Sequence, residues 1–196
     1  MFAVYLTHPQ VAIDPAIPVP DWSLSETGRA RVEALAEAPW VAGIGRIVCS
    51  DERKAVETAE ILAAAAGCTV EIVAQMGEND RSATGFLAPP DFEAAADRFF
   101  AAPEASFRGW ERAVDAQTRI VAAVERALEP HDPAVPLLFV GHGGVGTLLK
   151  CHLGARPISR SEDQGPGGGG MVFGFSLVDR HLLCDWTPIE SFGGFA

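Results

Sequence analysis

The sequence predicts an α/β protein, built as a three-layer α/β/α sandwich with a mostly parallel central sheet. Short apolar runs alternate with longer segments of helical periodicity along most of the 196 residues. Because a strand, a helix and a second strand in succession form a parallel pair with the helix on one face, this alternation favours helices on both sides of one sheet. We expect a single domain, residues 1–196, since a chain of this length can bury roughly 70% of the surface that it exposes when unfolded.

The elements follow from apolar runs and from residues that start or stop helices. Ser25 is expected to cap the first helix, Ser50 is the cap candidate for the second, and Gly67 ends the second. The remaining predicted elements are a proline-rich loop at 11–20, a charged loop at 77–90, a flexible glycine-rich linker at 165–170, strands at 2–6, 43–49, 69–73, 171–177 and 182–187, a strand that begins at 136, and helices at 26–36, 51–66, 91–100 and 109–128.

Two histidines stand where predicted strands end. His142 follows the apolar run that begins at Pro136 and precedes a glycine-rich helix start. His8 follows the first strand, in Thr7-His8-Pro9. In a parallel sheet both strand ends open onto one crevice. Since a helix N-terminus presents unpaired N–H groups and a positive dipole end, the sequence predicts an anion site beside the two histidines.

Composition narrows the class of partner. The net charge of −11 argues against a nucleic-acid or anionic-membrane surface, so a phosphate site has to be local. The sequence shows no membrane-span pattern and no signal-peptide pattern, and a cytoplasmic location is the expectation. We expect free thiols, no metal and no cofactor, because the four cysteines are widely spaced and the other three histidines lack ligand spacing. The oligomeric state stays open, a homodimer included.

The chain resembles the histidine phosphatase superfamily, the phosphoglycerate mutase-like proteins, along nearly its whole length. His8 stands at the nucleophile of the family's Arg-His-Gly, and Leu24-Ser25-Glu26-Thr27-Gly28 is similar to its Leu-Thr-x-x-Gly. The segment SDERKAVETAE, residues 50–60, is similar to Ser-x-x-x-Arg-Ala-x-x-Thr-Ala, and GHGG, residues 141–144, to the Ser-His-Gly-Gly of the second histidine. Glu78 matches the position of the proton donor.

The resemblance implies a phosphomonoester hydrolase with a phosphohistidine intermediate. Neutral His8 would attack phosphorus, Glu78 would protonate the leaving oxygen, and water would then hydrolyse the intermediate. His142 would donate to the phosphoryl oxygens. Asp80 is the alternative acid. The residues expected to contact the phosphate of a small phosphorylated substrate are Thr7, Arg53, Lys54, Arg81 and Gly143.

Three positions differ from the family pattern and support a second hypothesis. Thr7 replaces an arginine, Asp14 an asparagine, and Lys54 a bidentate arginine. The chain could therefore be a catalytically weak or inactive member that binds a phosphorylated ligand. Arg53 and Arg81 are the candidates for compensation.

Three further functions have weaker support. The pattern Gly141-x-Gly143-x-x-Gly146 suits a dinucleotide-binding turn, but no acidic residue follows at the tip of a later apolar strand. A phosphoglycerate mutase-type phosphotransferase would need a denser cationic pocket. A serine hydrolase would need a Gly-x-Ser-x-Gly elbow around Ser50, which is absent from the sequence.

Overall fold

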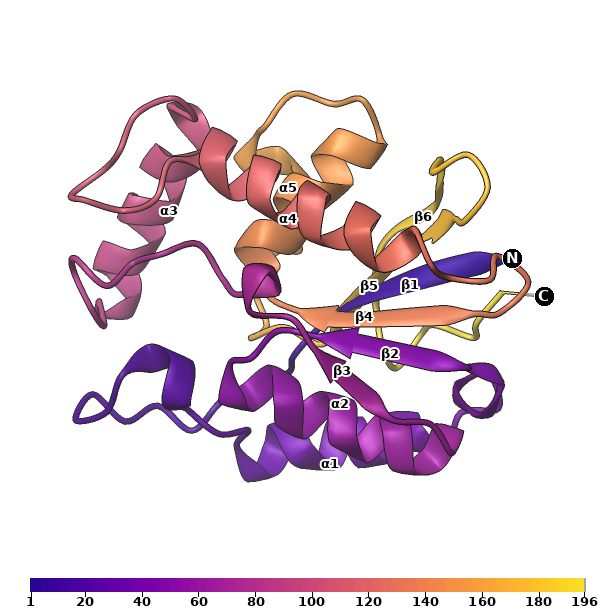
Figure 1. Ribbon diagram of the computed structural model, residues 1–196. Helices are drawn as coiled ribbons and strands as arrows, with labels where there is room; N and C mark the ends of the chain where they lie inside the picture. The colour runs from indigo at the N-terminus through magenta and orange to yellow at the C-terminus, as the bar shows by residue number, and fades with distance from the viewer. Residues whose placement is uncertain (196) are drawn as a thin grey trace.

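The computed structural model describes residues 1–195 and contains a six-stranded sheet between two layers of helices (Figure 1). The strands, in sheet order, are β3 (Val70–Ile72), β2 (Arg46–Cys49), β4 (Leu137–Gly141), β1 (Phe2–Thr7), β5 (Met171–Ser176) and β6 (Leu182–Pro188). The first four are mutually parallel, whereas β5 runs antiparallel to β1 and β6 antiparallel to β5. The predicted α/β sandwich with a mostly parallel sheet is confirmed.

Two helices cover one face of the sheet and three lie on the other side (Figure 1). Their bounds are α1 (Glu26–Ala36), α2 (Arg53–Ala66), α3 (Pro89–Ala101), α4 (Ala113–Leu128) and α5 (Gly143–Leu153). The alternation of side chains along β1 joins both layers: Ala3 and Tyr5 belong to the apolar cluster under α4 and α5, while Val4 and Leu6 belong to the cluster under α1 and α2.

Two local predictions need correction. Ser50 does not cap the second helix: α2 begins at Arg53, its N-cap residue is Glu52, and the Ser50 hydroxyl accepts from the Glu52 amide at 3.1 Å. Residues 50–52, between β2 and α2, therefore form a turn before the helix starts. This turn directs Ser50 and Glu52 toward the end of β4 rather than along α2.

The glycine-rich segment 165–170 does more than link two elements. Five of its residues have positive φ, a conformation that glycine adopts without strain. The Gly170 amide donates to the carbonyls of Thr7 and His8 at 3.1 and 3.2 Å, and a Cβ at Gly169 would collide with the His8 carbonyl. The segment therefore packs against the backbone at the end of β1. Among residues 1–195, no helix is both long and apolar enough to span a membrane.

Candidate active site

The register of two neighbouring strands places His8 beside His142. β1 and β4 pair in parallel with Thr7 opposite Gly141, so each histidine follows the last paired residue of its strand. The His8 amide continues the ladder by donating to the Gly141 carbonyl at 3.0 Å. The two rings meet edge to face with centroids 5.2 Å apart. The structure thus brings together the two histidines that the sequence placed at strand ends.

The ring of His8 is held in one tautomer. Its Nδ1 lies 2.8 Å from the Pro9 carbonyl oxygen, which can only accept, so Nδ1 carries the proton and Nε2 keeps its lone pair. Burial, followed by the field of His142, lowers the pKa of His8 to about 3, against the opposing hydrogen bond to Pro9. His8 is therefore a neutral imidazole with a free Nε2 throughout the ordinary pH range.

His142 is fully buried and held by its backbone and its side chain. The Tyr5 hydroxyl donates to the His142 carbonyl at 3.2 Å and accepts from the His142 amide at 3.1 Å. The ring Nε2 lies 2.8 Å from the Ser50 hydroxyl, and within residues 1–195 its Nδ1 has no hydrogen-bond partner. Burial lowers the pKa of His142, although the carboxylates of Glu52 and Glu78 oppose this shift.

Replacing Tyr5 with phenylalanine is expected to loosen His142. The variant loses the hydroxyl that serves both backbone groups of His142, and a buried group left without a partner costs about 1–3 kcal/mol. We expect a free energy of unfolding lower by that amount in urea titrations, together with reduced turnover. A fully stable Tyr5→Phe protein would contradict this role.

Sequence reasoning missed Glu52, which lies between several of the expected site residues. One carboxylate oxygen accepts from the Glu78 amide at 2.8 Å and lies 3.5 Å from His142 Nε2. The other forms a buried ion pair with Lys54, whose ammonium also donates to the Val19 carbonyl at 2.8 Å. Burial raises the pKa of Glu52, but His142 and Lys54 outweigh it and lower the pKa to about 2. The signal in the sequence was an acidic residue two positions before the lysine at the family's arginine position.

Glu78 closes the N-terminal end of α5. Its carboxylate accepts from the amides of Gly144, Val145 and Asn79, each at 3.0 Å. The anion that the helix N-terminus was expected to attract is thus partly supplied by the protein itself. Glu78 Oε2 accepts one of these three bonds and Oε1 the other two, which leaves one acceptor site of Oε2 free.

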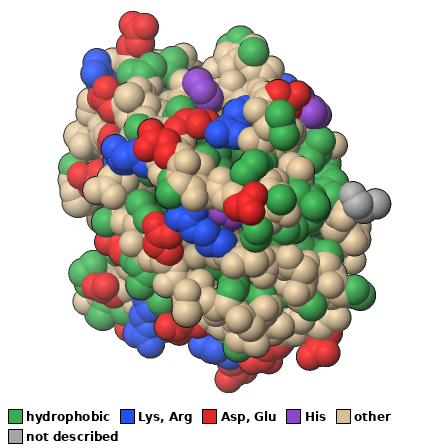
Figure 2. Space-filling view, turned by 45° about the vertical axis from the view of Figure 1, so that its right-hand side comes forward, with side chains coloured by type: hydrophobic (Ala, Val, Ile, Leu, Met, Phe, Trp, Pro, Cys, Tyr) green, Lys and Arg blue, Asp and Glu red, His purple; other side chains and the backbone are tan. Residues whose placement is uncertain are grey.

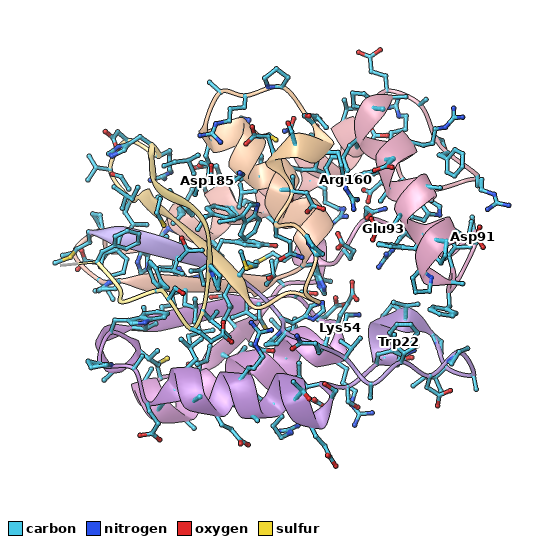
Figure 3. All side chains as sticks on the ribbon, turned by 180° about the vertical axis from the view of Figure 1, so that it is seen from behind. Trp22, Lys54, Asp91, Glu93, Arg160 and Asp185 are labelled. Carbon is cyan, nitrogen blue, oxygen red and sulfur yellow. The ribbon has the colours of Figure 1, made fainter. Side chains whose placement is uncertain are left out.

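A cleft of about 930 Å³ is lined by His8, by residues of α3 and by the segment after β1. Glu93 and Arg160, which also line it, are labelled in Figure 3. His8, Glu78, Arg81 and Gly143 all line it. Four aromatic residues also line it: Phe92, Phe99, Phe100 and Trp110. On the face shown in Figure 2, acidic and basic side chains are interspersed, with no broad area of one sign.

The other predicted site residues lie beneath or outside the cleft. Lys54 and His142 are buried and do not line it. Thr7 is also buried, with its hydroxyl 2.7 Å from Gln164 Oε1. Arg53 is exposed and pairs with Glu57 at 3.0 Å, so it is not brought to the phosphate position where it was expected.

Two acidic residues singled out in the sequence face solvent. Asp80 accepts from the Ser82 amide at 2.8 Å, a hydrogen bond that lowers its pKa. Asp14 accepts from the Ala16 amide at 2.9 Å. Both carboxylates stabilise turns, and neither residue lines the cleft.

Arg81 is the cation best placed to meet a ligand. It lines the cleft, and its guanidinium lies over the rings of Phe92 at 5.1 Å and Trp110 at 5.8 Å. Within the described part of the chain no carboxylate pairs with it, whereas Arg160, on the same cleft, pairs with Glu93 at 2.5 Å (Figure 3). Trp110, a buried aromatic residue, therefore also orients this arginine.

No metal centre is evident at the site. Residues 1–195 contain no group of three or more His, Cys, Asp or Glu side chains arranged to hold a metal ion. All four cysteines are free thiols. The arrangement provides a neutral imidazole, a carboxyl group and hydrogen-bond donors.

Comparison with known proteins identifies the family of the chain. The model of the histidine phosphatase superfamily (branch 1) matches residues 16–166, which include Lys54, Glu78 and His142 but not His8. Because the match covers most of the chain, this protein belongs to the histidine phosphatase superfamily, branch 1.

Solved structures resemble the chain along nearly its full length. A mycobacterial glucosyl-3-phosphoglycerate phosphatase, in complex with inorganic phosphate, has a TM-score of 0.78 at 25% identity, over 97% of this chain and 99% of that one. Bacillus stearothermophilus YhfR has a TM-score of 0.76 at 22% identity, over 92% and 93%. No curated protein has a matching sequence. The neighbours support phosphatase activity as the general class.

Proposed function

We propose that the protein is a phosphomonoester hydrolase that transfers a phosphoryl group to Nε2 of His8 and then to water. The observation that carries this proposal is the hydrogen bond from His8 Nδ1 to the Pro9 carbonyl, which leaves a neutral, nucleophilic nitrogen in the cleft. In the first step Nε2 forms a bond to phosphorus while the bond to the ester oxygen breaks. In the second, water displaces the histidine and releases phosphate.

Glu78 is the proposed proton carrier. It lines the same cleft as His8, and its Oε2 has room for a proton. It would give that proton to the leaving alcohol oxygen in the first step and take one from the attacking water in the second. Asp80 does not line the cleft, so the alternative acid has less geometric support.

The proposed phosphate contacts come from residues that line the cleft and from a buried residue behind them. Arg81 lines the wall of the cleft, and Gly143 is the first residue of α5 beside it. His142 would donate from below as negative charge grows on the phosphoryl oxygens. A cleft of about 930 Å³ suits a small phosphorylated molecule whose leaving group is bulkier than phosphate, as in the glucosyl-3-phosphoglycerate named for the mycobacterial neighbour.

A second candidate function is binding of a phosphorylated ligand without turnover. The ion pair between Lys54 and Glu52 favours it, because this pair removes a free cation from the floor. Phosphate release from a panel of phosphomonoesters tests the two. Turnover supports the hydrolase, and binding of the esters with no turnover by folded protein supports the alternative.

The charge state of His8 can be measured directly. Its lowered pKa, about 3, predicts that the ring remains neutral as the pH falls from 8 to 4, whereas an exposed histidine titrates near 6.5. An NMR titration of the histidine ring protons, with His8→Asn for assignment, checks this. A His8 signal that titrates near pH 6.5 would show that the nucleophile is protonated in mild acid and would contradict the account.

A further inference from the structure

We propose that Glu52 selects the charge state of the phosphoryl group: it acts as a built-in anion over Lys54, so the site accepts a singly charged phosphate and disfavours a doubly charged one. The inference rests on the proposed function only in taking phosphate as the ligand. It makes Glu52 a specificity-determining residue rather than a reacting one.

The first support is the position of the Glu52 carboxylate. It bonds to the Lys54 ammonium on one side and to the Glu78 amide, at 2.8 Å, on the other. It also lies 3.5 Å from His142 Nε2. The Glu52 side chain is 10% exposed and that of Lys54 is 4% exposed. Glu52, Lys54 and His142 lie behind the residues that line the cleft, so a phosphoryl group drawn toward Lys54 or His142 would approach this carboxylate.

The second support is the scarcity of other positive charge. His8, whose pKa is lowered to about 3, is neutral, burial lowers the pKa of His142, and Thr7 carries no charge. Arg53 faces solvent, where it pairs with Glu57. Among the described residues that line the cleft, Arg81 has no carboxylate partner, so a doubly charged phosphate would find one available cation.

The groups facing Glu52 come from every element packed against it. Lys54 is on α2, His142 precedes α5, His8 follows β1, Tyr5 is in β1, and Glu78 follows the turn after β3. Between mildly acidic and mildly alkaline pH, the lowered pKa values keep Glu52 ionised and His8 neutral, and burial lowers the pKa of His142. Over that interval the ligand itself changes charge, since phosphate passes from a single to a double negative charge.

Binding of inorganic phosphate, measured by calorimetry with the full chain, tests the proposal. At an effective dielectric constant of about 20, the repulsion between two like charges about 5 Å apart lowers a binding affinity by on the order of 100-fold. We expect the wild type to bind phosphate more weakly as the pH rises through the second ionisation of phosphate. Glu52→Gln keeps the hydrogen-bond acceptor but loses the charge, and we expect it to bind the doubly charged form on the order of 100-fold more tightly than the wild type.

The matched control is Glu60→Gln, the same substitution at an exposed position of the same helix. It should leave phosphate affinity unchanged at both pH values. A gain in Glu60→Gln equal to that in Glu52→Gln would reduce the effect to net charge and overturn the proposal.

A second variant covers the case in which Glu52→Gln does not fold because it leaves the buried Lys54 ammonium without its counter-charge. The double variant Glu52→Leu with Lys54→Met removes both buried charges and is expected to fold without gaining affinity for doubly charged phosphate. Wild-type affinity that is equal or higher for the doubly charged form overturns the proposal. Because binding is read as heat, a protein that binds phosphate in this way but hydrolyses nothing would defeat the hydrolase assignment and leave this inference standing.

Discussion

Replacing His8 with alanine is expected to lower the hydrolysis of any phosphomonoester by at least about 10⁴-fold, because the variant has no nucleophile to accept the phosphoryl group. Residual rate from electrostatic stabilisation by the remaining groups would be small by comparison. The measurement is phosphate release per enzyme under saturating and limiting substrate. Far-ultraviolet and near-ultraviolet circular dichroism should show an intact fold.

The control for this variant is His152→Ala. His152 is an exposed histidine on α5, outside the cleft, so its loss should leave turnover unchanged. If His8→Ala retained more than a tenth of wild-type activity, His8 could not be the nucleophile.

Replacing Lys54 with methionine is expected to cost about 3–5 kcal/mol of stability at neutral pH, because it leaves the buried Glu52 carboxylate without its counter-charge. Urea titrations at pH 7 measure this loss. The double variant Glu52→Leu with Lys54→Met should recover most of it, since neither charge remains buried. A single variant as stable as the wild type would show that the pair is not a coupled unit.

The ion pair between Glu52 and Lys54 should also make the stability of the wild type depend on pH. The folded pKa of Glu52, about 2, lies below its unfolded value of 4.5, so the stability from this group is present above pH 4.5 and is lost as the pH falls toward 2. In Lys54→Met the Glu52 carboxylate has no counter-charge, so its protonation stabilises the folded variant. The difference in unfolding free energy between the variant and the wild type should therefore shrink as the pH is lowered from 7 to 4.

The fold and the histidine pair were predictable because they depend on local patterns. Apolar runs that end at Thr7 and Gly141 define adjacent parallel strands, and the register of those strands brings His8 and His142 together. Glu78 was singled out by the resemblance to the family, and it does line the cleft.

The role of Glu52 was not predictable because it depends on where a turn directs a side chain. A carboxylate at a helix start is ordinarily solvated, and its burial here follows from α2 beginning at Arg53 instead of just after Ser50. Arg53 shows the converse: the helix turns it outward to Glu57. A shift of two residues in the helix start therefore decides which of two adjacent side chains enters the site.

The walls of the cleft also depended on tertiary packing. Trp110 and Phe92 come from separate segments, and their common function is to hold Arg81. The glycine-rich segment 165–170 looked like a linker because glycine is compatible with many conformations. Its contact with the His8 carbonyl follows from the close approach of the two backbones, which sequence spacing does not indicate.

The most direct test of the central claim is to trap the phosphorylated enzyme. Wild-type protein is mixed with a phosphomonoester that it hydrolyses, and the reaction is quenched rapidly under alkaline conditions. The protein is then digested and analysed by mass spectrometry. The account predicts one acid-labile phosphoryl group on His8, absent from His8→Ala. Turnover without a phosphorylated intermediate, or a phosphoryl group on any other residue, would contradict it.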